Sequence, residues 1–354
     1  MKKCIGIGFL GSVCAACACV VASARTMAAQ MDVVHGECAR LAAEAEREGN
    51  HTILGRDGWM YFAPELRHLG IGRFWGQAAA RVSRAAKPEF ADPLPAIVDF
   101  HDQLKRAGVE LLVVPVPPKA VIYPEHIFPA GMVTESEPRI DMLHQRFYEE
   151  LRSHGVNVLD LVPVFLEAKA GKTLYCRQDT HWSGAACIEA ARVLKEVIAA
   201  EPWYASLTRR KYAAVHGEIE ISGDLRSTMS GEAPAKEKVA IRYIQAAEAG
   251  DAEPVAPDPA SPVVLLGDSH NLVFHAGGDM HAAGAGLADQ LAFELGLPVD
   301  LIAVRGSGAT PARVNMLRRA RNPSYLAGKK IVVWCFSARE FTESTGWMKV
   351  PVVK

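Results

Sequence analysis

The sequence predicts an α/β fold of three layers, in which a mainly parallel sheet is covered by helices on both faces. From about residue 95 onward, short apolar runs rich in β-branched residues alternate with amphipathic helical patterns. Strands that are apolar throughout fit a sheet that is buried on both sides. One such run leads directly into Gly-Asp-Ser at 267–269, and open parallel sheets bind their ligands beyond these strand ends.

The elements before this alternation are less regular. Residues 31–49 are rich in alanine and glutamate and predict a helix. The segment "GRDGWMYF" at 55–62 predicts a turn at Arg56-Asp57-Gly58, followed by an aromatic-rich strand from Trp59. Residues 64–92 have no clear period, and we expect loops with some helix there.

The alternation then defines five strands and the helices between them. We expect helices at 96–107, 138–154, 183–200, 284–295 and 311–321, and strands at 109–117, 156–165, 261–269, 298–304 and 329–337. Ser183 is a suitable N-cap for the third of these helices. The region 202–260 interrupts the alternation with polar and proline-rich sequence, so we expect an insertion or the edge of a small subdomain.

The first 24 residues predict a secretory signal peptide or a signal anchor. Two lysines precede an uncharged apolar run from Cys4 to Ala24, which ends in the small triplet Ala-Ser-Ala. A run of this length is also just long enough to span a bilayer if it is not cleaved. We therefore expect residues 30–354 to form one domain in the periplasm, associated with the inner membrane if the leader is retained.

Charge and cysteine content narrow the function classes. The formal net charge of −1 argues against a broad electrostatic surface for nucleic acid. Four cysteines follow the leader, and in an oxidising compartment they permit two disulfides, although buried free thiols fit the sequence as well. These cysteines are Cys38, Cys176, Cys187 and Cys335.

Three residues have the types and positions of a nucleophilic triad. Ser269 lies on the tight turn after a buried strand, but a serine hydroxyl is a poor nucleophile until a base removes its proton. His181 in "CRQDTHWSG" is a candidate base, and Asp179, two residues earlier, is a candidate carboxylate to orient the ring. The pair precedes a helix, so both side chains lie on a loop from which they can turn toward the serine.

Other residues near these motifs have weaker roles. Lys119, Arg305 and Trp182 are candidates for substrate contact, and the loops near Lys119 or Arg305 are candidates for a second oxyanion donor beside the Ser269 amide. Arg339 follows the last strand and is a further candidate for the edge of the site. Asp268 and His270, together with Asp179 and His181, have metal-binding side chains, but they lack the i, i+4 spacing of a helical zinc motif, so no metal is predicted.

Four segments resemble the alginate O-acetyltransferase family, which includes the AlgJ and AlgX proteins and has an SGNH-hydrolase-like domain. They are "GRDGWMYF", "VPVPPKAVIYPE" at 114–125, "DTHWSGAA" at 179–186 and "LLGDSHNLVF" at 265–274, and the resemblance runs from about residue 50 to 340. In this family, the Asp and His of an Asp-x-His-Trp motif and the Ser of a later Gly-x-Ser motif form the triad. They match Asp179, His181 and Ser269. His270 departs from the aromatic or small residue expected after the serine.

The resemblance implies a periplasmic O-acetyltransferase that acetylates the hydroxyls of an alginate-like exopolysaccharide through an acyl-enzyme. It also implies an acetyl donor supplied by a membrane-bound O-acyltransferase and a polysaccharide acceptor, and no cofactor is predicted. The Asp, His, Ser order differs from that of ordinary GDSL esterases, in which the serine comes first. Two alternatives stay open: a secreted carbohydrate acetylesterase, and a non-catalytic subunit of a polysaccharide modification or export complex.

Overall fold

The computed structural model describes residues 31–133, 139–228, 235–247 and 253–353. The predicted leader at 1–24 lies outside these residues. Within the described ranges, no helix is both long enough and apolar enough to cross a membrane. The helix expected at 31–49 is present at residues 31–47.

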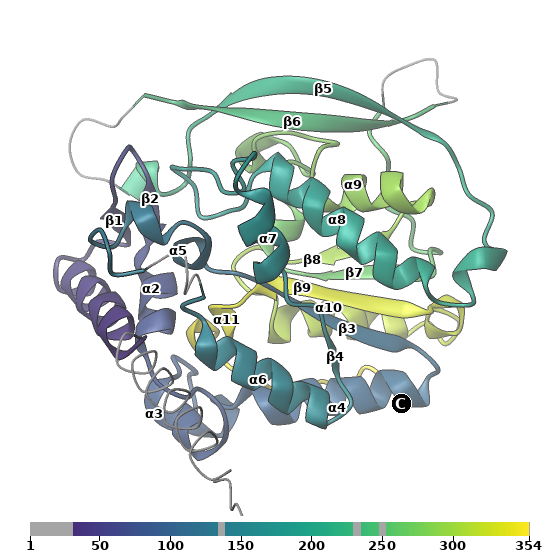
Figure 1. The fold of residues 1–354 in the computed structure, drawn as a ribbon. Coiled ribbons are helices and arrows are strands. Elements are labelled where there is room, and N and C mark those ends of the chain that lie inside the picture. The colour runs from purple at the N-terminus through teal and green to yellow at the C-terminus, as the bar shows by residue number, and fades with distance from the viewer. Residues whose placement is uncertain (1–30, 134–138, 229–234, 248–252, 354) are drawn as a thin grey trace, which may run out of the picture.

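A five-stranded parallel sheet forms the middle of the fold, with the strand order β4-β3-β9-β7-β8 (Figure 1). The strands are β3 (Glu110–Val116), β4 (Asn157–Val158), β7 (Val263–Gly267), β8 (Asp300–Ala303) and β9 (Ile331–Ser337). Each lies within its predicted range, although β4 fills only a small part of it, and the parallel arrangement is the one that the sequence predicts. The last strand in the chain, β9, lies at the centre between β3 and β7.

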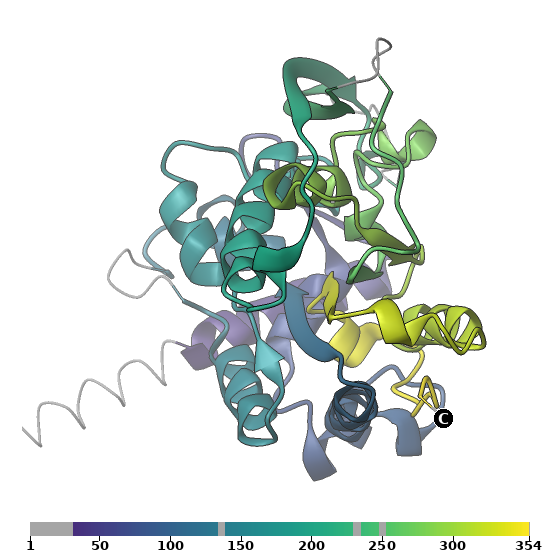
Figure 2. The ribbon, with the colours of Figure 1, turned by 90° about the vertical axis from the view of Figure 1, so that its right-hand side faces the viewer.

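Helices cover both faces of this sheet and give the three predicted layers (Figures 1 and 2). One core joins the sheet to α7 (Val162–Ala168), α8 (Gly184–Ala199) and α9 (Leu287–Leu295). The other joins it to α4 (Pro93–Arg106), α6 (Met142–Ser153) and α10 (Thr310–Ala320). Successive residues of β9 alternate between the two cores: Val333 lies in the first and Trp334 in the second. This period of two explains why the strands of this sheet are mostly apolar, with polar residues only at strand ends.

The prediction of a strand at 156–165 is wrong over most of its length. Only Asn157–Val158 pair with β3, and helix α7 begins at Val162. Pro163 stands in the first helical turn, where it needs no hydrogen-bond partner, and the Asp160 side chain accepts from the Val162 amide at 3.0 Å. A short apolar run fits a buried strand and a buried helix equally well, and here the proline and the aspartate favour the helix.

The remaining elements lie at the sides of the sheet. The irregular segment 64–92 contains α2 (Ala63–Gly70) and α3 (Ala79–Val82), while α5 (Lys119–Ile122) and α11 (Glu340–Glu343) directly follow β3 and β9. The predicted turn at 56–58 joins β1 (Thr52–Leu54) to β2 (Met60–Phe62). The region 202–260 contains a long antiparallel hairpin of β5 (Tyr212–Ile221) and β6 (Glu237–Ala246), which contacts α8 and α9 (Figure 1).

Candidate active site

Ser269 begins a short 3-10 helix (Ser269–Asn271) directly after the carboxyl end of β7. The turn needs a glycine before it, because a Cβ atom at Gly267 would lie 1.7 Å from the Cys335 carbonyl oxygen of the neighbouring strand. Asp268 caps the short helix by accepting from the His270 amide at 2.9 Å. The serine side chain is thereby fixed at the edge of the sheet where ligands of such folds bind.

The structure brings the three predicted residues into one hydrogen-bonded line. The Nδ1 atom of His181 lies 2.6 Å from Oδ1 of Asp179, and its Nε2 atom lies 2.8 Å from Oγ of Ser269. A carboxylate can only accept, so Nδ1 carries a proton and donates it. In the neutral ring Nε2 is then the acceptor, and the Ser269 hydroxyl donates to it. This tautomer is the one that a general base needs in order to take the serine proton.

Electrostatics favour a protonated ring once the proton arrives. Burial alone lowers the pKa of His181, but the charge and hydrogen bond of Asp179 outweigh burial and raise it above its ordinary value. Burial likewise raises the pKa of Asp179, and the contacts with His181 and then His281 outweigh it, so this carboxyl titrates well below its usual range. Asp179 is therefore an anion that stabilises an imidazolium.

Two residues that sequence reasoning missed complete the surroundings of Asp179. Its outer oxygen, Oδ2, accepts from the Asp224 amide and lies 2.9 Å from Nε2 of His281. The Asp224 carboxylate accepts in turn from the amide and hydroxyl of Thr180 at 2.7 and 2.6 Å. Asp224 lies in the connection between β5 and β6, and His281 lies in a Gly- and Ala-rich loop. Neither place has a sequence motif that marks it as part of a site.

Lys119 is buried against the loop that carries Asp179 and His181, and it binds backbone carbonyls of the protein. Only 1% of the residue is exposed, and its ammonium group donates to the carbonyl oxygens of Asp179 at 2.5 Å and Met60 at 2.9 Å, with a longer contact to Arg177 at 3.4 Å. Burial lowers its pKa. The predicted substrate contact therefore finds no basis in this geometry, because all three carbonyls belong to the protein.

Trp182 and Arg305, the other two predicted substrate contacts, differ in their exposure. Trp182 is fully buried, and its indole N–H donates to the His270 carbonyl at 3.0 Å, so it supports the two histidine loops from inside. Arg305 is exposed beyond the carboxyl end of β8, as predicted, but its guanidinium forms a two-pronged ion pair with Asp279. Arg339 forms an ion pair with the buried Glu65 at 3.2 Å.

The unexpected His270 is an internal residue. Its ring lies 1% exposed beside that of His181, with centroids 4.9 Å apart, and its Nδ1 donates to Asp268 at 3.1 Å. Burial lowers the pKa of His270, so the ring is neutral and adds no positive charge next to the base.

The four residues considered for a metal site in the sequence do not form one cluster in the structure. Ligand atoms of Asp179, His181 and Asp224 lie within 4.8 Å of one another, while Asp268 and His270 form a separate pair. Both Asp179 oxygens, however, accept from N–H groups, namely those of His181, the Asp224 amide and His281. An oxygen pair turned toward N–H donors fits the orientation of an imidazole better than the coordination of a cation.

The four cysteines that follow the leader are all buried and unpaired, so of the two readings that the sequence left open the structure favours free thiols over disulfides. Burial raises the pKa of each thiol, which keeps the sulfurs protonated and unreactive.

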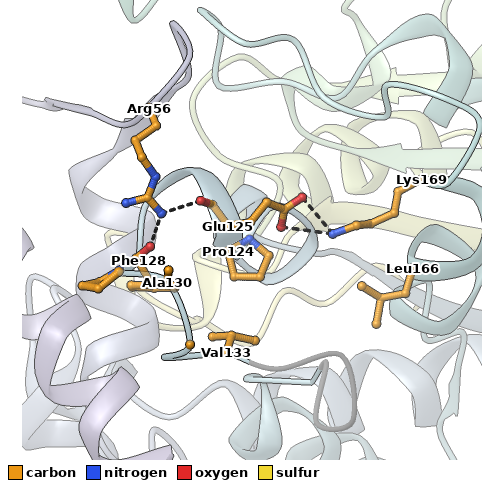
Figure 3. Close-up of a pocket in the computed structure, with 10 residues that line it drawn as sticks. Arg56, Pro124, Glu125, Phe128, Ala130, Val133, Leu166 and Lys169 are labelled. Carbon is orange, nitrogen blue, oxygen red and sulfur yellow. Dashed lines mark hydrogen bonds and ion pairs between the residues drawn. The ribbon is translucent and has the colours of Figure 1, made fainter.

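Neither of two open pockets in the described part of the chain is lined by a residue of the triad. One of about 850 Å³ is lined by Pro124, Phe128, Val133 and Leu166, with Arg56 and the Glu125–Lys169 ion pair at its sides (Figure 3). Another of about 640 Å³ passes Arg177 and Gln178, on the same loop as Asp179.

Comparison with known proteins decides the family. Residues 52–338 match the model of the SGNH hydrolase-like domain of the acetyltransferase AlgX. The chain belongs to this family. The resemblance of the four sequence segments is thereby confirmed, and the fold is SGNH-hydrolase-like as predicted.

Individual members of the AlgX family agree with this assignment. The chain is 26% identical over 227 residues to a probable alginate O-acetylase AlgJ of Pseudomonas fluorescens, covering 62% of this chain and 53% of that protein. It is 25% identical over 263 residues to the alginate biosynthesis protein AlgX of Pseudomonas putida, covering 71% and 52%. The chain thus spans about half the length of the curated relatives it matches.

Solved structures support the fold. The O-acetyltransferase domain of Pseudomonas putida AlgJ superposes with a TM-score of 0.61 at 23% identity, over 82% of this chain and 92% of that domain. Pseudomonas aeruginosa AlgX gives a TM-score of 0.59 at 18% identity, over 81% and 61%.

Proposed function

We propose that the protein is a periplasmic O-acetyltransferase that transfers acetyl groups to hydroxyls of an alginate-like exopolysaccharide. Membership of the AlgX family supports acetyl transfer, and the observation that carries the chemistry is the line of two hydrogen bonds through Asp179, His181 and Ser269. The predicted leader supports export. The acetyl group comes from a donor that a membrane-bound O-acyltransferase partner supplies.

The geometry supports a two-step reaction. In the first step, Oγ of Ser269 attacks the acetyl carbonyl carbon while its proton moves to Nε2 of His181. The tetrahedral oxyanion collapses, the bond to the donor oxygen breaks, and His181 returns the proton to this leaving oxygen. The products are an acetyl ester of Ser269 and the free donor alcohol.

In the second step, a sugar hydroxyl takes the place of the donor. His181 accepts the hydroxyl proton as the sugar oxygen attacks the acetyl carbon, and the proton then passes to Oγ of Ser269 as the ester bond to the serine breaks. The Ser269 amide is our proposed oxyanion donor in both steps; removing a donor of this kind typically costs about 10²–10³ in rate. Water in place of the sugar would make the same triad an esterase.

The test uses an acetyl ester donor with and without oligouronate acceptors. We expect the wild type to release donor alcohol faster when acceptor is present and to raise the mass of the sugar by one acetyl group. Ser269→Ala should abolish both signals with an unchanged unfolding transition, while Ser206→Ala, an exposed serine, should abolish neither.

Two other results would redirect the assignment. Loss of acetyl groups from an acetylated polymer, with equal turnover in water, would identify a carbohydrate acetylesterase. If Ser269→Ala keeps full acetylation of the exopolysaccharide in cells, the protein is a non-catalytic subunit and the proposal is wrong.

A further inference from the structure

The carboxylate of Asp179 lies between two histidines. Its inner oxygen, Oδ1, faces His181 at 2.6 Å, and its outer oxygen, Oδ2, faces Nε2 of His281 at 2.9 Å. Since the carboxylate can only accept, Nε2 of His281 carries a proton and donates it. The side chain of Asp179 is 2% exposed and that of His281 is 11% exposed, so water competes weakly for this bond.

The backbone at His281 is strained. With φ +71° and ψ −51°, this residue is the centre of a γ-turn, closed by the hydrogen bond from the Ala282 amide to the Met280 carbonyl at 2.9 Å. This left-handed γ-turn is rare, and such a conformation in a residue with a Cβ atom costs about 1–3 kcal/mol. Such strain persists where the surrounding structure compensates for it, and it is concentrated at functional sites.

The loop around His281 is closed by its own hydrogen bonds and is continuous with the short helix of Ser269. The Phe274 amide donates to Met280 at 2.8 Å and the Gly277 amide donates to Ala282 at 2.8 Å, which ties the two sides of the loop together. The segment begins directly after the short helix of Ser269, and it returns through His281 to the acid. The chain that supplies the nucleophile thus also supplies a support for the carboxylate at the other end of the triad.

We propose that His281 is a positioning residue of the active site, which donates to the outer oxygen of Asp179 and keeps this carboxylate turned toward His181. The inference rests on the proposed function, because it assigns a role within the same acyl transfer. It explains why a polar ring is held in a strained turn at that point.

The test combines three variants with a matched control. His281→Phe removes the donor and keeps a ring, whereas His281→Gln keeps an N–H donor near the same place. His275→Phe is the control, because His275 lies in the same loop and makes an equivalent bond of 2.9 Å to the buried Asp289, with its side chain 13% exposed. His281→Gly relieves the strained turn and also removes the donor.

We expect His281→Phe to lower kcat for an acetyl ester about 10- to 100-fold with KM changed less than about twofold, because a displaced carboxylate misorients the base. His281→Gln should recover most of this loss, His275→Phe should keep the wild-type kcat, and His281→Gly should lose kcat without losing thermal stability. Loss of kcat in His275→Phe equal to that in His281→Phe would reduce the role to loop stability and overturn the proposal.

A second readout does not depend on activity. In the Ser269→Ala background, the pKa of the His181 ring is measured by NMR titration, once with His281 in place and once with the additional substitution His281→Phe. A fall means that the carboxylate has turned away from His181, as the proposal expects, whereas a rise means a more basic carboxylate in the same place and would overturn the positioning role. The charged and titratable groups that interact with the His181 ring are Asp179, Asp224, His270 and Arg339, and those that interact with His281 are Asp179 and Asp279.

The two proposals fail in different ways. If the wild type shows no acetyl-ester turnover while the pKa of His181 still falls on His281→Phe, acyl transfer is wrong and the positioning role stands. If the wild type is active and neither kcat nor the titration responds to His281→Phe, the positioning role is wrong.

Discussion

Replacing Lys119 by methionine tests how far a buried cation holds the catalytic loop in place. The ammonium group donates to the Asp179 carbonyl at 2.5 Å and to the Met60 carbonyl at 2.9 Å. Methionine keeps the length of the side chain and removes the donors. We expect the loop that carries Asp179 and His181 to shift, because two buried carbonyl oxygens then lack partners.

The magnitude follows from the bonds and from the burial. Hydrogen bonds to a charged group contribute about 1.5–3 kcal/mol each, so two of them contribute about 3–6 kcal/mol. Methionine also removes the desolvation cost of the buried ammonium, which is several kcal/mol and offsets part of this loss. We therefore expect the free energy of unfolding to fall by about 1–3 kcal/mol, and kcat to fall about 10²-fold, as for a misplacement of about 1 Å in a catalytic group.

Denaturant unfolding and acetyl-ester turnover measure the two effects, and Lys329→Met is the control. Lys329 is 3% exposed and donates to the Pro259 and Ser261 carbonyls at 2.6 and 2.8 Å, but it pairs with Asp300 at the opposite end of the sheet strands. It should lose stability and keep kcat. If Lys119→Met loses stability and keeps kcat within about twofold, the ammonium group does not position the triad, and the reasoning is wrong.

Three further predictions concern the loop, the base and the thiols. Gly223→Ala would place a methyl group 1.9 Å from the Gln178 carbonyl oxygen, so we expect kcat to fall at least about tenfold, while Gly36→Ala, with open space around its Cβ, keeps kcat; equal rates in both variants would contradict this. Because the pKa of His181 lies above its ordinary value of 6.5, kcat/KM should rise with pH through a midpoint above 6.5, and a midpoint below 6 argues against the base. The stability that pairing with Asp179 adds should be present below pH 6.5 and lost as the pH rises through the raised pKa. Iodoacetamide should modify the four thiols after denaturation without reductant and leave them unmodified in the native protein, whereas labelling that needs a reductant would demonstrate disulfides; the thiols are Cys38, Cys176, Cys187 and Cys335.

The sequence predicts most of the fold because its signals are local. Buried strands are apolar throughout, helices have an apolar face, and Ser183 caps α8 as predicted by accepting from the Ala186 amide. The wrong strand at 156–165 shows the limit of such signals, since strand and helix share the same apolar run there. The distinction comes from Pro163 and Asp160, whose effect on the first turn of α7 outweighs the preference of valines for strands.

The site is predictable where a motif carries chemistry and unpredictable where partners come from afar. Asp179, His181 and Ser269 have residue types that act together in acyl transfer, and the convergence predicted from their places near strand ends is present in the structure. His281 and Lys119 reach Asp179 from segments 102 and 60 residues away, and nothing in their own sequence neighbourhoods names that target. Lys119 after "PVPP" is predicted as a substrate contact, whereas the structure buries it among three carbonyl oxygens.

The site contains two Asp-x-His pairs, and their neighbours, not the motif, decide which ring favours the protonated form. In both pairs, one carboxylate oxygen accepts from the amide and the Nδ1 atom of the histidine, with ring contacts of 2.6 Å for His181 and 3.1 Å for His270. The pKa of His181 is raised and that of His270 is lowered by burial. If His270 were charged, two unit charges 4.9 Å apart would repel each other by about 3 kcal/mol at an effective dielectric constant of about 20. This repulsion would lower the pKa of His181 by about two, so the neutrality of His270 is a condition for the basicity of His181.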